Sequence, residues 1–152
     1  MKRTLPIITF VLLDFFIVRP AVSADLQKGN AAYQRGDYAA AVSIWTSLAE
    51  QGNADAQYNL GWMYDNGQGV TQNHKTAVKW YRLAAKQGDA FAQFNLGLMY
   101  QRGQGVIQDD KTAVKWYRLS AEQGNANAKV NLTAKYDEGS GVHQEYNIAV
   151  KW

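Results

Sequence analysis

The sequence contains no cysteine and only two histidines, and both facts limit what the protein can be. Without cysteine the fold has no disulfide bonds and needs no oxidising compartment for its stability, and the lipid-modified cysteine of a lipoprotein is excluded. The histidines, His74 and His143, occupy non-equivalent turns with no carboxylate cluster at ligand spacing. We therefore expect neither a tetrahedral metal site nor a bound cofactor.

A strong excess of basic charge is also missing from most of the chain. The protein has 16 basic and 13 acidic side chains, of which three basic and one acidic lie within the first 24 positions. The rest of the chain therefore has a formal net charge of only +1. Such a nearly neutral surface provides no field that attracts phosphate backbones, so we do not expect a nucleic acid as a partner.

Motifs that support hydrolysis by a nucleophile are absent as well. The few serines lie outside any Gly-x-Ser-x-Gly or Ser-x-x-Lys motif, and no nucleophile lies beside a base within a local motif. Asp109-Asp110 aligns with Asn73-His74 and marks the start of a helix rather than an acid–base pair. We therefore predict that the protein is not an enzyme. The alternative is an active site assembled from distant positions.

Residues 1–24 have the layout of a secretory signal peptide. Lys2 and Arg3 precede an apolar run at residues 5–18, and small residues form a cleavage motif at residues 21–24. Cleavage is expected at the end of this motif, with Asp25 as the mature N-terminus. An uncleaved membrane anchor is the competing interpretation, but the run is shorter than the roughly 20 residues that a span requires. We predict an exported protein, either periplasmic in a bacterium or secreted, with no stable membrane span after cleavage.

What the chain does have is internal repetition with a period of 36 residues. Residues 75–83, Lys-Thr-Ala-Val-Lys-Trp-Tyr-Arg-Leu, return letter for letter at residues 111–119, and a shorter echo occupies residues 149–152. A fixed period of this size is typical of stacked supersecondary units. The pattern predicts an all-α solenoid of helix-turn-helix repeats, located at residues 53–88, 89–124 and, incompletely, 125–152.

Paired stop and start signals divide each repeat into two helices. A glycine followed by Asn or Asp, as at Gly52-Asn53, ends one helix in a left-handed residue and caps the next one. The first helix of each repeat, helix A, is expected near residues 54–66, 90–102 and 126–138. The second, helix B, is expected to start at Asn73, Asp109 and Glu145.

Residues 25–52 form an atypical first unit. Its turn, Gly36-Asp37-Tyr38, is five residues shorter than the turns of the later repeats. Terminal repeats often diverge because one of their faces meets water. We therefore predict a helix pair that caps the N-terminal end of the solenoid. A diverged copy of the repeat is the alternative.

Helix B presents a stripe of small and aromatic residues at helical spacing. In the first repeat the stripe consists of Ala77, Trp80, Tyr81, Ala84 and Ala85. We interpret it as core, in which Trp80, Trp116 and the adjacent tyrosines fill the space between units. The recurrent glycines of helix A, Gly61 and Gly97, suggest a close approach of two backbones, and the Gly-x-Gly turns reverse the chain.

One face of helix A carries the candidate binding residues. Asparagines recur there at three equivalent positions, beside residues that vary among the repeats. The candidate partner-binding residues are Tyr58, Asn59, Trp62, Phe94, Asn95 and Asn131. Asparagine amides can bond the backbone of an extended peptide while aromatic rings accept its side chains. Alternatively, the asparagines satisfy backbone groups between helices, and Trp62 belongs to the core.

These motifs resemble the Sel1-like repeat, a relative of the tetratricopeptide repeat. The signature runs from Ala56 through Leu60-Gly61 and Gly67-x-Gly69-Val70 to Gly88, and a second copy spans residues 92–124. The resemblance implies a right-handed α-solenoid whose A helices line the concave side. It also implies a scaffold or adaptor that binds a protein or peptide partner.

Some secreted relatives of this type are described as binding or hydrolysing β-lactams. The competing function is therefore an envelope hydrolase that acts on β-lactams or cell-wall material. Those relatives carry a pair of cysteines in each repeat, whereas this chain has none. We therefore favour a scaffold without catalytic activity.

The third repeat stops at Trp152, before the alanines of its helix B. An apolar edge is therefore expected at this end, and it offers a surface for weak self-association. A truncated gene product is the alternative explanation.

Overall fold

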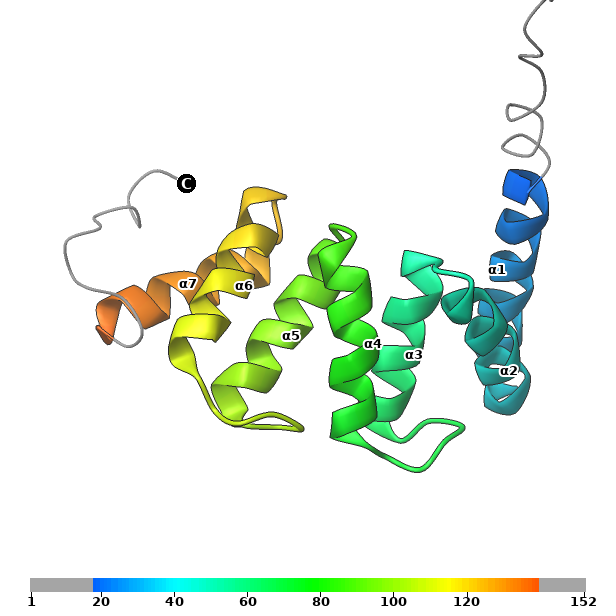
Figure 1. Ribbon diagram of the computed structural model, residues 1–152, viewed down its shortest axis with the longest axis horizontal. Helices are drawn as coiled ribbons and strands as arrows, with labels where there is room; N and C mark the ends of the chain where they lie inside the picture. Colours follow the sequence, from blue (N-terminus) through cyan, green and yellow to red (C-terminus); the bar gives the residue numbers. More distant parts are fainter. Residues whose placement is uncertain (1–17, 140–152) are drawn as a thin grey trace, which may run out of the picture.

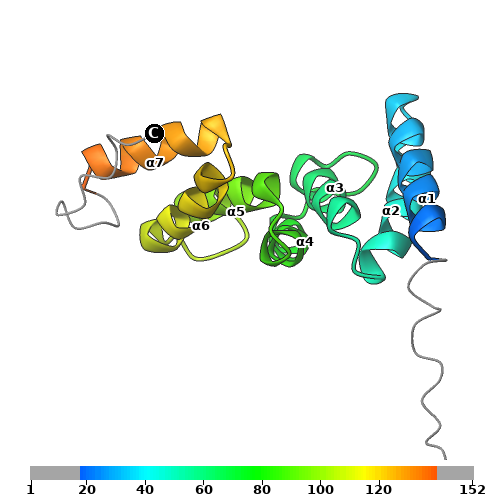
Figure 2. The ribbon, with the colours of Figure 1, turned by 90° about the horizontal axis from the view of Figure 1, so that it is seen from above.

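The computed structural model describes residues 18–139, which form seven α-helices and no β-strand. The helices are α1 (Val18–Gln34), α2 (Tyr38–Glu50), α3 (Ala54–Asn66), α4 (His74–Lys86), α5 (Ala90–Arg102), α6 (Asp110–Glu122) and α7 (Ala126–Asp137). Each helix packs against the next, which produces an elongated row (Figure 1). α3, α5 and α7 lie along one side of this row and α4 and α6 along the other (Figure 2). The all-α solenoid predicted from the period is confirmed.

The helix boundaries follow the predicted capping signals. Asn53, Asp89 and Asn125 each accept a hydrogen bond from the backbone N–H three residues later, at 2.8, 2.7 and 3.1 Å. Asn73 and Asp109 do the same for α4 and α6, so these two residues are N-caps rather than the first helical residues. α7 ends at Asp137, one residue before the prediction. Local polar side chains therefore determine where the A and B helices begin.

The first helix begins within the predicted signal peptide. α1 begins at Val18, so the expected signal-peptide cleavage position lies within this helix. Residues 1–17, which include most of the predicted signal peptide, lie outside the described residues. So do residues 140–152, which include the predicted helix B of the third repeat and its apolar edge. None of the helices within residues 18–139 has the length and apolar character needed to cross a membrane.

The predicted stripe of helix B forms the core, with a division of roles between its aromatic residues. Tyr81 and Tyr117 are fully buried. Trp80 and Trp116 are half-buried, and each packs against the core cluster on its N-terminal side. The tyrosines therefore fill the interior of each repeat, and the tryptophans cover the boundary between successive units.

The recurrent glycines of helix A are explained by these tyrosines. A Cβ atom at Gly61 would lie 2.5 Å from the Tyr81 ring, and one at Gly97 would lie 2.6 Å from the Tyr117 ring. Such distances are shorter than real Cβ contacts, so both positions require glycine unless the ring moves. An aromatic ring thus rests on each glycine. The predicted approach of two backbones is seen only at Gly97, where the added Cβ would also lie 3.3 Å from the Ala113 carbonyl oxygen.

The second glycine of each Gly-x-Gly turn joins one unit to the preceding one. Gly69 has a φ of 67°, and a Cβ there would lie 2.7 Å from the Cβ of Tyr38 at the start of α2. A Cβ at Gly105 would collide in the same way with the carbonyl group of His74 at the start of α4. The turns thus reverse the chain and also fix the spacing between units.

Paired glutamines connect three successive helices in each of the first two repeats. The Gln57 amide donates to the Ala49 carbonyl at 3.0 Å and accepts from the Gln87 amide at 2.7 Å. The same arrangement recurs in the second repeat with Gln93, Ala85 and Gln123. Gln57 and Gln93 are buried, so they satisfy the C-terminal ends of neighbouring helices rather than facing a partner.

The third repeat has a charged residue in its core. Lys135 occupies the position of Met63 and Met99 and is only 7% exposed. Its Nζ lies 3.3 Å from Asp110 Oδ1 and 3.2 Å from Glu138 Oε2. Burial lowers the pKa of Lys135, but the two carboxylates more than reverse this effect, and the pKa lies above its usual value. The solenoid thus tolerates an ion pair where the earlier repeats have a methionine.

Candidate binding site

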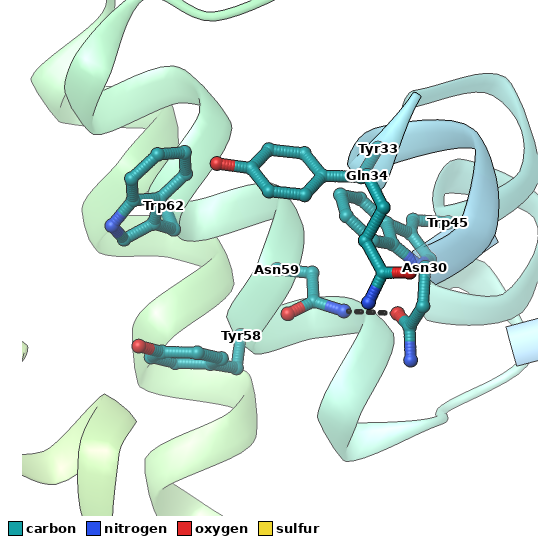
Figure 3. A pocket seen from close by; sticks show the side chains of 7 residues that line it. All are labelled: Asn30, Tyr33, Gln34, Trp45, Tyr58, Asn59 and Trp62. Carbon is teal, nitrogen blue, oxygen red and sulfur yellow. Dashed lines mark hydrogen bonds between the residues drawn. The ribbon is translucent and has the colours of Figure 1, made fainter. Parts of the chain in front are cut away.

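A pocket of about 360 Å³ opens where the first unit meets the first repeat. Its walls come from α1, α2 and α3 (Figure 3). The lining residues are Asn30, Tyr33, Gln34, Trp45, Tyr58, Asn59 and Trp62. All seven are aromatic or carboxamide side chains, and none of them carries a charge. The pocket therefore offers flat apolar surfaces and hydrogen-bonding amides to a neutral group.

Tyr33 holds the aromatic walls of the pocket in place. Its ring centroid lies 5.3 Å from that of Tyr38, 5.8 Å from that of Trp45 and 5.7 Å from that of Trp62. The contact with Trp62 is edge-to-face, at an interplanar angle of 86°. The Tyr33 hydroxyl donates to Gln68 Oε1 at 3.3 Å. These contacts fix the orientation of the rings, so the pocket is preformed.

Two carboxamides face each other across the pocket. Asn59 Nδ2 donates to Asn30 Oδ1 over 3.5 Å, the dashed line in Figure 3. This distance is at the upper end of hydrogen bonding, so the bond is weak. A carboxamide has two donor hydrogens and two acceptor lone pairs. Most of the bonding capacity of Asn30 and Asn59 is therefore available to a ligand.

The predicted partner-binding residues divide between two environments. Tyr58, Asn59 and Trp62 line the pocket. Phe94, Asn95 and Asn131 lie farther along the same side of the solenoid, and each is half-buried. The ring of Phe94 lies 5.9 Å from that of the buried Tyr117. The predicted surface is thus hollowed at its N-terminal end, and its remaining residues partly cover the core.

The asparagines of the second and third repeats lie beside buried tyrosines. Burial raises the pKa of Tyr81, and it raises the pKa of Tyr117 to about 12. Asn95 lowers the pKa of Tyr81, and Asn131 lowers the pKa of Tyr117, so both asparagines oppose the effect of burial. The Asn95 amide does not reach hydrogen-bonding geometry with the Tyr81 hydroxyl, which has no hydrogen-bond partner in the described part of the chain. Each of these two asparagines thus borders the buried tyrosine of the preceding helix B.

Four lining residues were not predicted from the sequence. They are Asn30, Tyr33, Gln34 and Trp45, and all belong to the atypical first unit. The period of 36 residues does not align α1 with the later A helices, because the turn after α1 is shorter. An alignment that allows for this shorter turn is the signal that places Tyr33 at the position of Tyr64.

The lining of the pocket consists of aromatic and carboxamide side chains alone. Its seven residues include no serine, histidine, lysine or carboxylate that acts as a nucleophile, acid or base. His74 lies 3.0 Å from Asp65, but neither residue lines the pocket. Among residues 18–139 no group of three or more His, Asp or Glu side chains is placed to hold a metal ion. The arrangement is suited to binding.

Comparison with known families agrees with the periodicity. The Sel1 repeat family matches residues 54–89 and residues 90–125. This chain carries two Sel1 repeats. Each repeat begins and ends one residue later than the ranges 53–88 and 89–124 predicted from the spacing. The Sel1 signature thus covers α3 to α6, and half of the pocket lies N-terminal to it.

Two solved structures with Sel1-type repeats are similar to most of the chain. The Sel1 repeat protein from Oxalobacter formigenes shares 39% identity with a TM-score of 0.79, over 84% of this chain and 52% of that one. The protein c5321, a protective antigen of uropathogenic Escherichia coli strains with an SLR fold, shares 37% identity with a TM-score of 0.80, over 88% and 30%. This chain therefore spans about half of the first protein and less than a third of the second.

A third structure shares the fold alone. Helicobacter pylori cysteine rich protein B has 20% identity and a TM-score of 0.59, over 76% of this chain and 97% of that one. That protein is described as cysteine rich, whereas the Sel1 repeats of this chain contain no cysteine. No curated protein sequence matches the chain at a significant level.

Proposed function

We propose that this protein is an exported, non-catalytic scaffold that binds a segment of a protein partner on the side formed by α3, α5 and α7. Sel1 repeats generally serve as protein-interaction scaffolds. The observation that carries the proposal is the pocket of about 360 Å³, with aromatic and carboxamide walls, on this side. Catalytic groups are absent from its lining.

The pocket suits a side chain presented by an extended segment. An apolar side chain of the partner fills the space between Tyr33, Tyr58 and Trp62, while Asn59 bonds the backbone beside it. Aromatic residues in such a position contribute about 2 kcal/mol or more to binding when they are truncated to alanine. We therefore place the main anchor of the partner at the N-terminal end of the solenoid.

Photocrosslinking in the native cell tests this proposal. A benzophenone amino acid at position 62 is expected to capture one discrete protein partner. The matched control places the same amino acid at position 83, because Leu83 is exposed on α4, on the opposite side of the row. The same adduct at both positions, or no adduct at position 62, would contradict the proposal.

The proposed export rests on the sequence pattern of residues 1–24. Cleavage before Asp25 removes residues 18–24 from α1 but retains the part that contributes Asn30, Tyr33 and Gln34 to the pocket. The mature protein thus keeps the complete site. N-terminal sequencing of the protein from the extracytoplasmic fraction is expected to start at Asp25. An uncleaved chain confined to the cytoplasm would exclude export.

Two further proposals concern partners. We propose that nucleic acid is not a partner, since the chain after residue 24 is nearly neutral. We also propose weak self-association through residues 125–152. Val130 on α7 is 67% exposed and supports an apolar surface at this end. Sedimentation equilibrium is expected to show concentration-dependent dimers, and a monomer at every concentration would argue against this contact.

A further inference from the structure

An exposed aromatic residue adjoins the pocket without belonging to the core. Phe91, in the first turn of α5, is 62% exposed. Its ring centroid lies 6.1 Å from that of Tyr58, which lines the pocket. The equivalent residues of the other repeats are Asp55 and Asn127. Since polar residues serve at the same position, the fold does not require a phenylalanine here, and its exposed ring is free to contact a ligand.

Two carboxylates lie around this pair of rings. Asp55 is exposed in the first turn of α3, three residues before Tyr58 and on the same face of the helix. Asp89 precedes Phe91 by two residues and caps α5 by accepting the Ala92 N–H at 2.7 Å. Within residues 18–139 neither carboxylate forms an ion pair with a basic side chain. The pair of rings thus adjoins two carboxylates that have no basic side chain as a partner and are stabilised only by the N-terminal ends of α3 and α5.

Burial is the largest cause of the pKa shifts of the acidic groups at this place. Burial raises the pKa of Asp89, and the carboxylate of Asp55 raises it further, against the lowering effect of the Ala92 N–H. Burial also raises the pKa of Tyr58, and the charge of Asp89 adds to that shift. A positively charged group placed between these residues relieves both repulsions.

We infer that the partner segment carries an arginine that stacks on the rings of Tyr58 and Phe91, between Asp55 and Asp89. This inference rests on the proposed function, because it names the kind of residue that lies next to the one in the pocket. A guanidinium fits better than an ammonium, since its planar group stacks on aromatic rings and donates to carboxylates at its edge. The partner segment is therefore basic, with a neutral residue beside the arginine.

NMR titration of the mature chain with two small probes tests this inference. The probes are N-acetyl-arginine N-methylamide and its citrulline analogue, which has the same shape without the charge. We expect the arginine probe to shift the ring signals of Tyr58 and Phe91 and to bind roughly two- to five-fold more tightly than the citrulline probe. Added salt is expected to weaken the binding of the arginine probe alone.

Variants show which residues bind the arginine probe. Asp55→Asn and Phe91→Ala are each expected to weaken the arginine probe by roughly two- to five-fold. Asp137→Asn removes the same charge from an exposed residue of α7 and is expected to change nothing. All three residues are exposed, so we expect each variant to retain its helices. Circular dichroism checks this expectation.

The outcomes separate this inference from the proposed function. Equal binding of both probes, or no shift with the arginine probe, overturns the inference. The proposed function then still stands if position 62 captures a partner in the crosslinking experiment. A missing adduct at position 62 overturns the function, whatever the probes show.

Discussion

The two complete Sel1 repeats share an interior. In both, a buried tyrosine rests on a glycine, as Tyr81 does on Gly61 and Tyr117 on Gly97. In both, paired glutamines join three helices, and an arginine of helix B donates to a tyrosine hydroxyl of the next helix A, at 3.0 and 2.7 Å. These contacts leave little freedom for substitution, because each partner of a contact fixes the size of the other.

The same repeats differ on the side proposed to bind a partner. Tyr58 and Trp62 of the first repeat are replaced by Phe94 and Leu98 in the second, and Asp55 is replaced by Phe91. Only the first repeat has α1 beside it to complete a pocket. The comparison indicates that packing between helices maintains the repeat, whereas the exposed side of helix A is free to specialise.

The strongest test of the shared interior is to add a methyl group at the glycine on which the buried tyrosine ring rests. We expect Gly61→Ala and Gly97→Ala each to lower the free energy of unfolding by about 1–3 kcal/mol, because the new Cβ overlaps a fully buried ring. In an exposed helix the same change would stabilise by about 1 kcal/mol. Urea denaturation provides the measurement. Gly52→Ala is no substitute, since the φ of 93° at Gly52 introduces backbone strain.

Thr133→Ala serves as the control, because Thr133 stands at the glycine position of α7. Its hydroxyl donates to the Lys129 carbonyl within the same helix at 3.0 Å. We expect a change of less than about 1 kcal/mol. Tolerance of alanine at Gly97 would show that the ring contact does not explain the recurrence of glycine.

The third repeat extends the comparison through the ion pairs of the buried Lys135, whose partners Asp110 and Glu138 are partly exposed. Replacing Lys135 by Met restores the residue found in the first two repeats but leaves the buried Asp110 Oδ1 without the cation that it contacts, so we expect a loss in stability of about 1–3 kcal/mol. Thermal unfolding of Lys135→Met checks this expectation, with the exposed Lys111→Met as the control. A gain in stability would show that the packing of methionine outweighs the ion pairs at this position.

The same lysine predicts a dependence on pH. The pKa of Lys135 is raised in the folded protein, so its contribution to stability is fully present below the usual value of 10.5. That contribution is lost as the pH rises through the higher folded value. We expect amide protection in α7 to fall selectively in this alkaline range, and Lys135→Met to abolish the dependence. Equal loss of protection in α3 would attribute the effect to general unfolding.

The smallest expected effect concerns the hydroxyl groups of the two buried tyrosines. Tyr117 donates to Gln101, whereas the equivalent residue near Tyr81 is Asp65, which contacts His74 instead. Asp65→Gln is expected to supply the missing acceptor and to stabilise by about 0.5–1 kcal/mol. Gln101→Asp is the reciprocal change and is expected to destabilise by a similar amount. Chemical denaturation measures the free energy of unfolding of both variants. Changes of the same sign in the two variants would show that the residue at this position does not act through the tyrosine hydroxyl.

The helices were predictable because their signals are local. A glycine followed by Asn or Asp specifies a corner wherever it occurs, and the period of 36 residues repeats that information. Residues whose partners lie in other helices were harder to interpret. Gln57 and Gln93 directly precede the candidate residues Tyr58 and Phe94 in the sequence, yet both glutamines are buried against the ends of neighbouring helices.

The pocket was only half predictable for the same reason. Tyr58, Asn59 and Trp62 belong to a repeat that the period identifies, so their side of the site was found. The opposite wall comes from α1, whose position depends on a turn that is five residues shorter. Periodicity alone does not show that α1 approaches α3 closely enough to place Asn30 opposite Asn59.

The location of the pocket at a boundary has a mechanical consequence. Its walls belong to two successive units of an elongated row, so any flexing at this joint changes the distance between α1 and α3. A partner side chain that fills the space opposes such a change in distance, whereas α4 to α7 do not line the pocket and are not held by it. Binding at this pocket thus reduces the relative motion of α1 and α3 at the N-terminal end of the solenoid.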